Sequence, residues 1–155
     1  MKAAVLGAGA WGTALAKLLA EKGADVSLWA RRRELAEAIA QDRENARYLS
    51  GVPLPKNVSV THDLGDAVRH AHAVLFVVPS HAMREVARAA CPHLAPDALA
   101  IGATKGIETD SLLFMDEVLD VEFFTEAELR ALIAANDVDH KTVAGLARAG
   151  VRVSE

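Results

Sequence analysis

A glycine-rich turn between an apolar segment and a helical pattern is the feature that most constrains this fold. Residues 2–6 read KAAVL, an apolar run suited to a buried parallel strand. Residues 7–12 read GAGAWG, which matches the pattern G-x-G-x-x-G, and apolar residues at helical spacing follow. In such a turn Gly7 permits the tight change of direction, Gly9 lets the backbone approach a pyrophosphate, and Gly12 lets the helix lie close to the sheet. The segment therefore predicts a dinucleotide-binding turn.

The first turn of the helix that follows would supply the binding groups. Its backbone N–H groups have no partner inside the helix, and the helix dipole favours negative charge at this end. The alternative is a tight strand-to-helix turn that binds nothing. The glycine pattern alone allows both interpretations, and the strand before it and the helix after it favour the dinucleotide.

Strands and helices alternate along the first 120 residues. We expect strands at 2–6, 26–29, 58–61, 73–78 and 99–103, and helices at 11–22, 33–41, 64–69, 81–90 and 110–119. Asp63 is expected to cap the third helix, whereas the segment 43–57, with Gly51, Pro53 and Pro55, is expected to be irregular. This order predicts an α/β fold, a Rossmann-type doubly wound and mainly parallel sheet with right-handed crossovers and a short C-terminal helical tail.

The residues after the second expected strand bear on which dinucleotide would bind. NAD-selective sites usually place an acidic residue about 20 residues after the turn, where it bonds the ribose hydroxyls. This chain reads ARRR at 30–33, and the first carboxylate is Glu34. Arg31 and Arg32 can bond a 2′-phosphate through planar hydrogen bonds, which favours NADP(H) and leaves NAD(H) as a second possibility. A solvated charge run is the alternative, although the dipole at a helix start disfavours it.

Lys105 is a candidate for contact with a substrate. It follows the fifth expected strand, at the carboxyl edge where open α/β sheets bind ligands, and Gly106 lies beside it. Its ammonium could pair with a phosphate or polarise a carbonyl. A solvated surface lysine is the alternative interpretation.

Composition excludes several other classes of function. Lys and Arg number 17 against 21 Asp and Glu, so a net charge of −4 leaves no overall electrostatic footprint for nucleic acid or an anionic membrane. The single cysteine, Cys91, excludes an internal disulfide and a cysteine-based zinc site, and the six histidines form no H-x-x-x-H pattern, so no metal is expected. No apolar run is long enough for a membrane span and no secretory signal opens the chain, so we expect a cytoplasmic protein.

Several segments, taken in order, resemble one known family. They are GAGAWGTALAKLLAEKG at 7–23, VSLWARR at 26–32, REN at 43–45, YLSGVPLP at 48–55, VVPSHAMREV at 77–86 and ATKGIE at 103–108. In this order they resemble the start of bacterial NAD(P)-dependent glycerol-3-phosphate dehydrogenase, over about residues 1–119. That family reversibly reduces dihydroxyacetone phosphate to sn-glycerol 3-phosphate and feeds phospholipid biosynthesis. The resemblance therefore implies an oxidoreductase with a small phosphate substrate.

The resemblance also implies roles for single residues. The pyrophosphate would be held by the turn, the adenosine end would meet the two arginines, the nicotinamide would be bordered by a proline, and one lysine would contact both cofactor and substrate. These residues are Gly7, Gly9, Ala10, Trp11 and Gly12 in the turn, Arg31 and Arg32, Pro79, and Lys105. The family often has serine at the position of Ala10, and alanine there removes a hydroxyl contact but keeps the backbone one.

The resemblance ends after Leu119. In the family, a strand leading into a Gly-Pro-Ser segment comes next, followed by a helical domain with the catalytic lysine. Residues 120–155 contain no proline, and their pattern predicts a helix at 125–135, a second helix from Asp139 to Gly150 and a strand at 151–153. We therefore expect an NAD(P)-binding Rossmann domain at 1–119 and a helix–helix–strand extension at 120–155 that packs on the sheet or completes it.

These expectations leave the activity open between two classes. The chain could be a truncated glycerol-3-phosphate dehydrogenase that is weakly active or inactive alone. Lys105 is then the one well-placed candidate for the proton donor, although its position favours a contact with substrate and cofactor. The chain could instead be a non-catalytic dinucleotide-binding or interaction module. We expect an exposed apolar surface where a second domain would pack, which would allow a homodimer, and we expect no nucleic acid partner and no membrane insertion.

Overall fold

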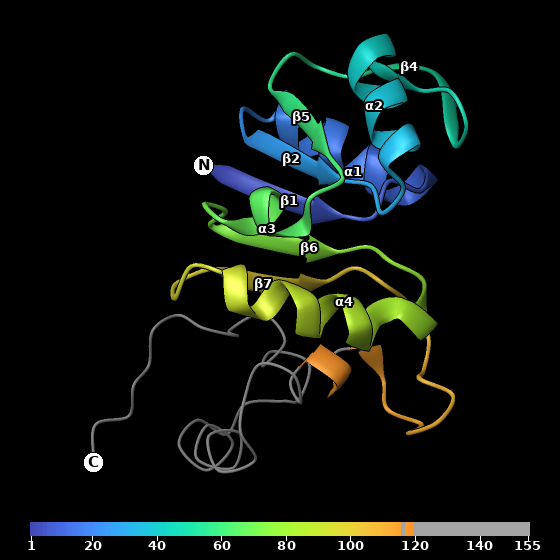
Figure 1. Cartoon of the computed structure of the whole chain (residues 1–155), viewed down its shortest axis with the longest axis vertical. Coiled ribbons are helices and arrows are strands. Elements are labelled where there is room, and N and C mark those ends of the chain that lie inside the picture. The colour runs from blue at the N-terminus through green and yellow to red at the C-terminus, as the bar shows by residue number, and fades with distance from the viewer. Residues whose placement is uncertain (116, 120–155) are drawn as a thin grey trace.

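The computed structural model describes residues 1–115 and 117–119, and it contains a five-stranded parallel sheet (Figure 1). The strands lie in the order β5-β2-β1-β6-β7. Their bounds are β1 (Lys2–Leu6), β2 (Asp25–Trp29), β5 (Val58–Thr61), β6 (Ala73–Phe76) and β7 (Leu99–Gly102). Every neighbouring pair in this sheet is parallel. The predicted α/β, Rossmann-type sheet is confirmed.

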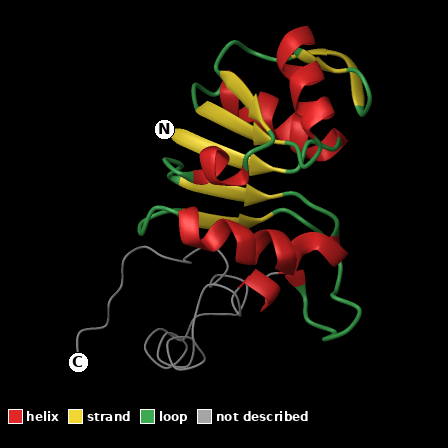
Figure 2. Ribbon diagram, in the orientation of Figure 1, coloured by secondary structure: helices red, strands yellow, loops and turns green. Residues whose placement is uncertain are grey.

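Helices cover both faces of the sheet (Figure 2). The helices are α1 (Ala10–Glu21), α2 (Arg33–Asp42), α3 (Leu64–Val68) and α4 (Met83–Ala90), and 3₁₀ turns at Ser80–Ala82 and Cys91–His93 flank α4. The predicted cap of the third helix is confirmed, because the Asp63 carboxylate accepts a hydrogen bond of 2.8 Å from the backbone N–H of Asp66.

Alternate residues of the central strands enter two separate hydrophobic clusters. Leu6 and Phe76 face the cluster that contains α3 and α4, and Val5 faces the cluster that contains α1 and α2. All three side chains are fully buried. Because successive side chains of a strand point to opposite faces, a nearly continuous apolar strand supplies both layers of a doubly wound fold.

The chain changes direction across the sheet between β1 and β6. From β1 it continues outward through β2 to β5 and then returns to place β6 on the other side of β1, with β7 beyond it. This arrangement separates the connections that follow β1 and β6 at their carboxyl ends. Ligands of open α/β sheets bind in the crevice at such a switch point.

The segment 43–57 contains two short strands, so its predicted irregularity is wrong for residues 44–45 and 49–53. β3 (Glu44–Asn45) and β4 (Leu49–Pro53) form a two-stranded antiparallel hairpin, with a register shift between Glu44 and Asn45. Gly51 has a φ of +75°, a conformation that glycine adopts without strain, and it lies where the register of the hairpin shifts. Pro53 pairs with Glu44 in a sheet so small that each strand has an open edge. Glycine and proline are tolerated at such edges and bulges, so their presence did not exclude strands.

The helix expected at 110–119 begins later than predicted. Ile107 forms an antiparallel bridge with Phe114, and residues 109–111 form a turn. The helical residues are 115 and 117–119. The Glu117 carboxylate accepts a hydrogen bond of 2.7 Å from the backbone N–H of Phe114, and such a bond favours a helix start at this point rather than at Asp110.

The last described residues belong to the same core. Met115, Val118 and Leu119 are buried in the cluster that also contains α3 and α4. By contrast, Ile107 and Phe114 are exposed in the connection before them. The predicted helices at 125–135 and 139–150 and the predicted strand at 151–153 lie outside the described residues.

Candidate functional site

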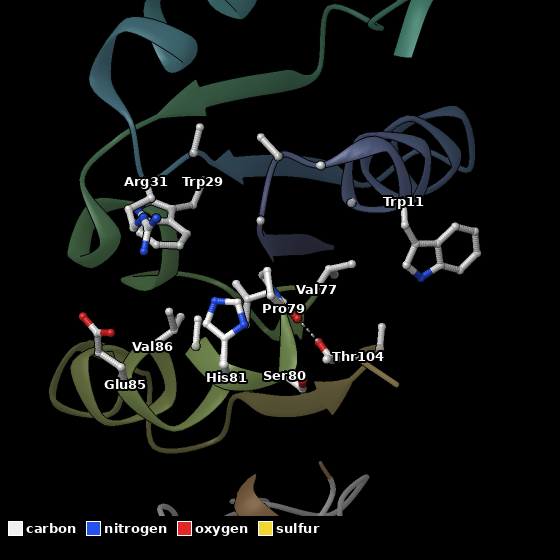
Figure 3. Close-up of a pocket in the computed structure, with 18 of the residues that line it drawn as sticks. Trp11, Trp29, Arg31, Val77, Pro79, Ser80, His81, Glu85, Val86 and Thr104 are labelled. Atoms are coloured by element: carbon white, nitrogen blue, oxygen red, sulfur yellow. Dashed lines mark hydrogen bonds between the residues drawn. The ribbon is translucent and has the colours of Figure 1, made fainter. Parts of the chain in front are cut away.

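A cavity of about 1200 Å³ lies at the carboxyl ends of the parallel strands. Figure 3 shows side chains from several connections around it, including Trp11 beyond β1, Arg31 beyond β2, Pro79 beyond β6 and Thr104 beyond β7. Every residue that the sequence suggested as a binding residue lines this cavity, namely Gly7, Gly9, Ala10, Trp11, Gly12, Arg31, Arg32, Pro79 and Lys105. The tertiary structure thus brings together residues that are about 100 positions apart in the chain.

Two glycines of the turn are required by packing. Gly7 has a φ of +125°, and a Cβ at this position would lie 2.3 Å from the backbone oxygen of Val77. A Cβ at Gly12 would lie 1.8 Å from the backbone oxygen of Gly7. Both distances are far below any normal contact, so these glycines let β1, α1 and the segment after β6 approach one another.

Gly9 differs from the other two glycines because it faces open space. A Cβ there would meet no described atom within 4 Å, and its φ of −78° and ψ of −178° are ordinary extended values. Gly9 is the N-cap of α1, and neither a side-chain cap nor an acidic residue in the first turn occupies this end of the helix in the described structure. The helix start therefore offers backbone N–H groups to an anion in a space that a side chain would fill, which fits a phosphate group.

The two arginines follow β2 at the same edge of the cavity. Arg31 and Arg32 are both exposed, and Arg32 Nη2 donates a hydrogen bond of 3.1 Å to the Tyr48 hydroxyl. Tyr48 also lines the cavity, so the hairpin after α2 contributes to this end of the site. No Asp or Glu lies among the lining residues near β2, and Glu85 on α4 is the acidic residue of the described lining.

The segment that carries Lys105 is attached to the segment after β6. The Thr104 hydroxyl donates to the backbone oxygen of Val78 at 2.7 Å, which Figure 3 marks with a dashed line. Gly106 has a φ of +122°, and a Cβ there would lie 3.6 Å from Ser80. Lys105 itself is exposed. The backbone before Lys105 is therefore held against the segment after β6, while its ammonium is available at the edge of the cavity.

An ion pair holds the connection beyond Lys105 against α4. Arg84 Nε and Nη2 lie 2.9 and 2.7 Å from the two carboxylate oxygens of Glu108, which also accepts a hydrogen bond from the Ser111 hydroxyl. The hydrogen bonds from Arg84 and then Ser111 lower the pKa of Glu108 to about 2. The carboxylate is thus ionised at neutral pH and anchors this connection.

Sequence reasoning missed the buried polar groups behind the turn. Thr13 and Asn45 are both fully buried, and Asn45 Nδ2 donates to the backbone oxygen of Ala8 at 3.0 Å and to Thr13 Oγ1 at 2.8 Å. Asn45 lies in the segment that was expected to be irregular. No local sequence pattern links Asn45 to the glycine turn. The one sequence feature that pointed to Asn45 was the REN segment at 43–45, which belongs to the family resemblance.

Metal-ligating residues do not gather near this cavity. Within residues 1–115 and 117–119, no group of three or more His, Cys, Asp or Glu side chains could hold a metal ion. His81 lines the cavity and is exposed. In the same part of the chain, no helix combines the length and apolar character needed to cross a membrane.

A doubly wound parallel sheet whose first crossover opens on a glycine turn defines the Rossmann class of α/β domains. The family model described as the N-terminus of NAD-dependent glycerol-3-phosphate dehydrogenase matches residues 2–138 of this chain. The chain belongs to this family. The match continues beyond residue 119, where the segments recognised in the sequence end.

Individual relatives agree with this assignment. A glycerol-3-phosphate dehydrogenase (NAD(P)+) of Pelotomaculum thermopropionicum is 49% identical over 121 residues, which cover 78% of this chain and 35% of that protein. The enzyme of the same name from Nitratidesulfovibrio vulgaris is 42% identical over 151 residues, covering 97% of this chain and 46% of that protein. The crystal structure of glycerol-3-phosphate dehydrogenase from Coxiella burnetii is similar with a TM-score of 0.72 and 36% identity, over 78% of this chain and 37% of that one. The chain therefore spans less than half the length of these relatives.

Proposed function

We propose that this chain binds NADP(H) in the cavity at the carboxyl edge of its sheet, with NAD(H) as a weaker second ligand. The observation that carries the proposal is the open space at Gly9, where a Cβ would meet no described atom within 4 Å at the N-terminus of α1. The proximity of Arg31 and Arg32 supports a ligand with a further phosphate near the end of β2. Membership of a family described as NAD-dependent supports a nicotinamide dinucleotide.

Each part of the cavity has a separate task in this proposal. The first turn of α1 contains Ala10, Trp11 and Gly12, and the backbone N–H groups of this turn bind the diphosphate. Arg31 and Arg32 bond the 2′-phosphate, and Pro79 borders the nicotinamide. The bound cofactor supplies the hydride chemistry, whereas the chain binds and orients it.

We further propose that this binding serves the reduction of dihydroxyacetone phosphate to sn-glycerol 3-phosphate, the reaction that the sequence resemblance implies and that fits relatives named glycerol-3-phosphate dehydrogenase. Lys105 then binds the substrate phosphate or its carbonyl from the edge of the cavity. A proton must also reach the oxygen of the reduced carbonyl, and among the described residues Lys105 is a better phosphate ligand than proton donor because it is exposed. Residues 1–155 by themselves are therefore expected to bind the cofactor but to turn over weakly or not at all.

The test combines binding with turnover. Trp11 and Trp29 both line the cavity, so tryptophan fluorescence reports titration with NADPH and with NADH, and calorimetry provides an independent Kd. A steady-state assay then follows NADPH oxidation with dihydroxyacetone phosphate. We expect saturable binding, a lower Kd for NADPH than for NADH, and little turnover.

Four outcomes separate the possibilities. Failure to bind either nucleotide would overturn the proposed function. Robust turnover would overturn the expected low activity while supporting the reaction. Weak turnover that Lys105→Ala abolishes supports the reaction, whereas binding with no detectable turnover favours a non-catalytic dinucleotide-binding module, to which the cavity-lining residues are equally suited.

A further inference from the structure

The Asn45 side chain uses its amide to join three segments behind the glycine turn. Its nitrogen donates to the backbone oxygen of Ala8 at 3.0 Å and to Thr13 Oγ1 at 2.8 Å, and its oxygen accepts from the backbone N–H of Tyr48 at 3.3 Å. Thr13 Oγ1 in turn donates to the backbone oxygen of Gly9 at 2.8 Å. Both donors and the acceptor of this buried amide are thus in use.

These bonds fix the direction of the two peptide groups at the turn. The structure describes no cis peptide bond in residues 1–115, and the C=O and N–H of a trans peptide point in opposite directions. Because Asn45 holds the carbonyl of Ala8, the N–H of Gly9 points away from Asn45. The carbonyl of Gly9 accepts from the backbone N–H of Thr13 at 2.9 Å and from the Thr13 hydroxyl at 2.8 Å, so the N–H of Ala10 points away from Thr13, and Asn45 contributes to this through the hydroxyl.

The same amide reaches the other end of the cavity through Tyr48. Asn45 Oδ1 orders the backbone of Tyr48, whose hydroxyl accepts a hydrogen bond of 3.1 Å from Arg32. Tyr48 and Arg32 line the cavity together with the glycine turn. One buried side chain therefore connects the turn with the arginine end of the site.

We propose that Asn45 is a positioning residue for dinucleotide binding. Through Ala8 and Thr13 it holds the N–H groups of Gly9 and Ala10 toward the diphosphate, and through Tyr48 it sets the place of Arg32. This inference rests on the proposed binding of NADP(H). Asn45 does not line the cavity itself, so its effect on the ligand is exerted through the residues it holds.

A second asparagine offers a matched control. Asn57 Nδ2 donates to the backbone oxygens of Ala20 at 2.8 Å and Ala24 at 2.7 Å, so it also uses one amide nitrogen for two bonds around α1. These bonds lie at the C-terminal end of the helix, opposite to the glycine turn. Asn57→Ala therefore removes a similar structural attachment without touching the proposed site.

The experiment measures Kd for NADPH and thermal unfolding for residues 1–155 and for the variants. We expect Asn45→Ala to raise Kd by about ten- to hundredfold, because a lost buried hydrogen-bond partner lets the peptide groups reorient. Asn45→Asp should do the same, because its carboxylate places acceptors against the Ala8 carbonyl. Asn57→Ala should lower the melting temperature while leaving Kd within about twofold, since effects of distant sites are largely independent.

A second pair of variants keeps the test decisive if Asn45→Ala does not fold. Thr13→Val removes the hydroxyl that links Asn45 to Gly9, and Thr13→Ser retains it. Thr13→Val should raise Kd, Thr13→Ser should restore it, and the amide NMR shifts of Gly9 and Ala10 should change only in the former.

Opposite results would overturn the inference in recognisable ways. It fails if folded Asn45→Ala or Thr13→Val binds NADPH like the parent, or if Asn57→Ala weakens binding equally. If the parent chain binds neither NADPH nor NADH, the proposed function fails first and the inference with it.

Discussion

Replacing Gly9 with alanine separates a glycine needed for a ligand from glycines needed for packing. The new Cβ would meet no described atom within 4 Å, and the φ of −78° and ψ of −178° at Gly9 suit any residue. Alanine leaves the unfolded chain fewer conformations than glycine, which stabilises the folded chain by about 0.4–1 kcal/mol. Alanine is also a poorer N-cap than glycine, which destabilises the folded chain by a similar amount. The free energy of unfolding should therefore change by less than about 1 kcal/mol.

The ligand should respond differently from the folded chain. The methyl group would occupy the open space at the N-terminus of α1 that we assign to the diphosphate. We expect Kd for NADPH to rise at least about tenfold, which corresponds to about 1.4 kcal/mol.

Gly12→Ala is the contrasting variant. Its Cβ would lie 1.8 Å from the backbone oxygen of Gly7, whereas the shortest ordinary carbon–oxygen contacts are about 3.3 Å. The helix or the turn must move by roughly 1.5 Å, and overpacking of this kind costs about 1–3 kcal/mol or more.

Thermal unfolding and fluorescence titration measure the two effects side by side. For a chain of this size 1 kcal/mol shifts the melting temperature by about 2–4 °C, so Gly9→Ala should stay within about 4 °C of the parent and Gly12→Ala should fall by more. The reasoning is refuted if Gly9→Ala binds NADPH as tightly as the parent. It is equally refuted if Gly12→Ala is as stable as the parent.

Three further predictions concern the cofactor, the ion pair and the core. Arg31→Ala should raise Kd for NADPH more than Kd for NADH, and an equal change in the two titrations would contradict a contact with the 2′-phosphate. Glu108 has its pKa lowered from 4.5 to about 2 in the folded chain, so its stabilising effect is complete above about pH 4.5 and is lost as the pH falls toward 2. Glu108→Gln should accordingly melt below the parent at pH 6, and melting curves should converge as the pH is lowered; a gap that is constant with pH would contradict this. Phe76→Ala should lower the free energy of unfolding by about 3–5 kcal/mol in urea titrations, because Phe76 is fully buried. Leu18→Ala, at a side chain that is 51% exposed, should change it by less than about 0.5 kcal/mol, and similar losses for both would contradict the assigned core.

Local sequence patterns were sufficient for the elements that build the sheet. A short apolar run, a glycine turn and helical spacing are properties of neighbouring residues, and they located β1 and α1 to within a residue. The alternation of strands and helices then predicted the Rossmann-type sheet, because few topologies satisfy short crossovers between parallel strands. The cavity-lining residues followed from their place at strand ends, where a parallel sheet collects its connections.

Local patterns failed where a distant contact decides the conformation. The hairpin at 44–53 contains residues that usually interrupt strands, and Arg43 supports it by donating to the backbone oxygen of Val58 at 2.8 Å. The helix expected from Asp110 begins at 115, after the bridge between Ile107 and Phe114. Neither outcome can be read from hydrophobic spacing, since both depend on hydrogen bonds that span a turn or a neighbouring segment.

Local sequence patterns were enough for the class of fold, the position of the glycine turn and part of the cavity lining, whereas Tyr48 was placed in that lining by the hairpin alone. Which glycines are required for packing and which one leaves space follows from the folded chain, because it depends on the approach of the Val77 and Gly7 backbone oxygens rather than on the glycine pattern. The tertiary structure also decided the role of Asn45, whose partner Ala8 is 37 residues away. A buried amide has to find hydrogen-bond partners wherever the folded chain supplies them, and the sequence does not state which ones will be near.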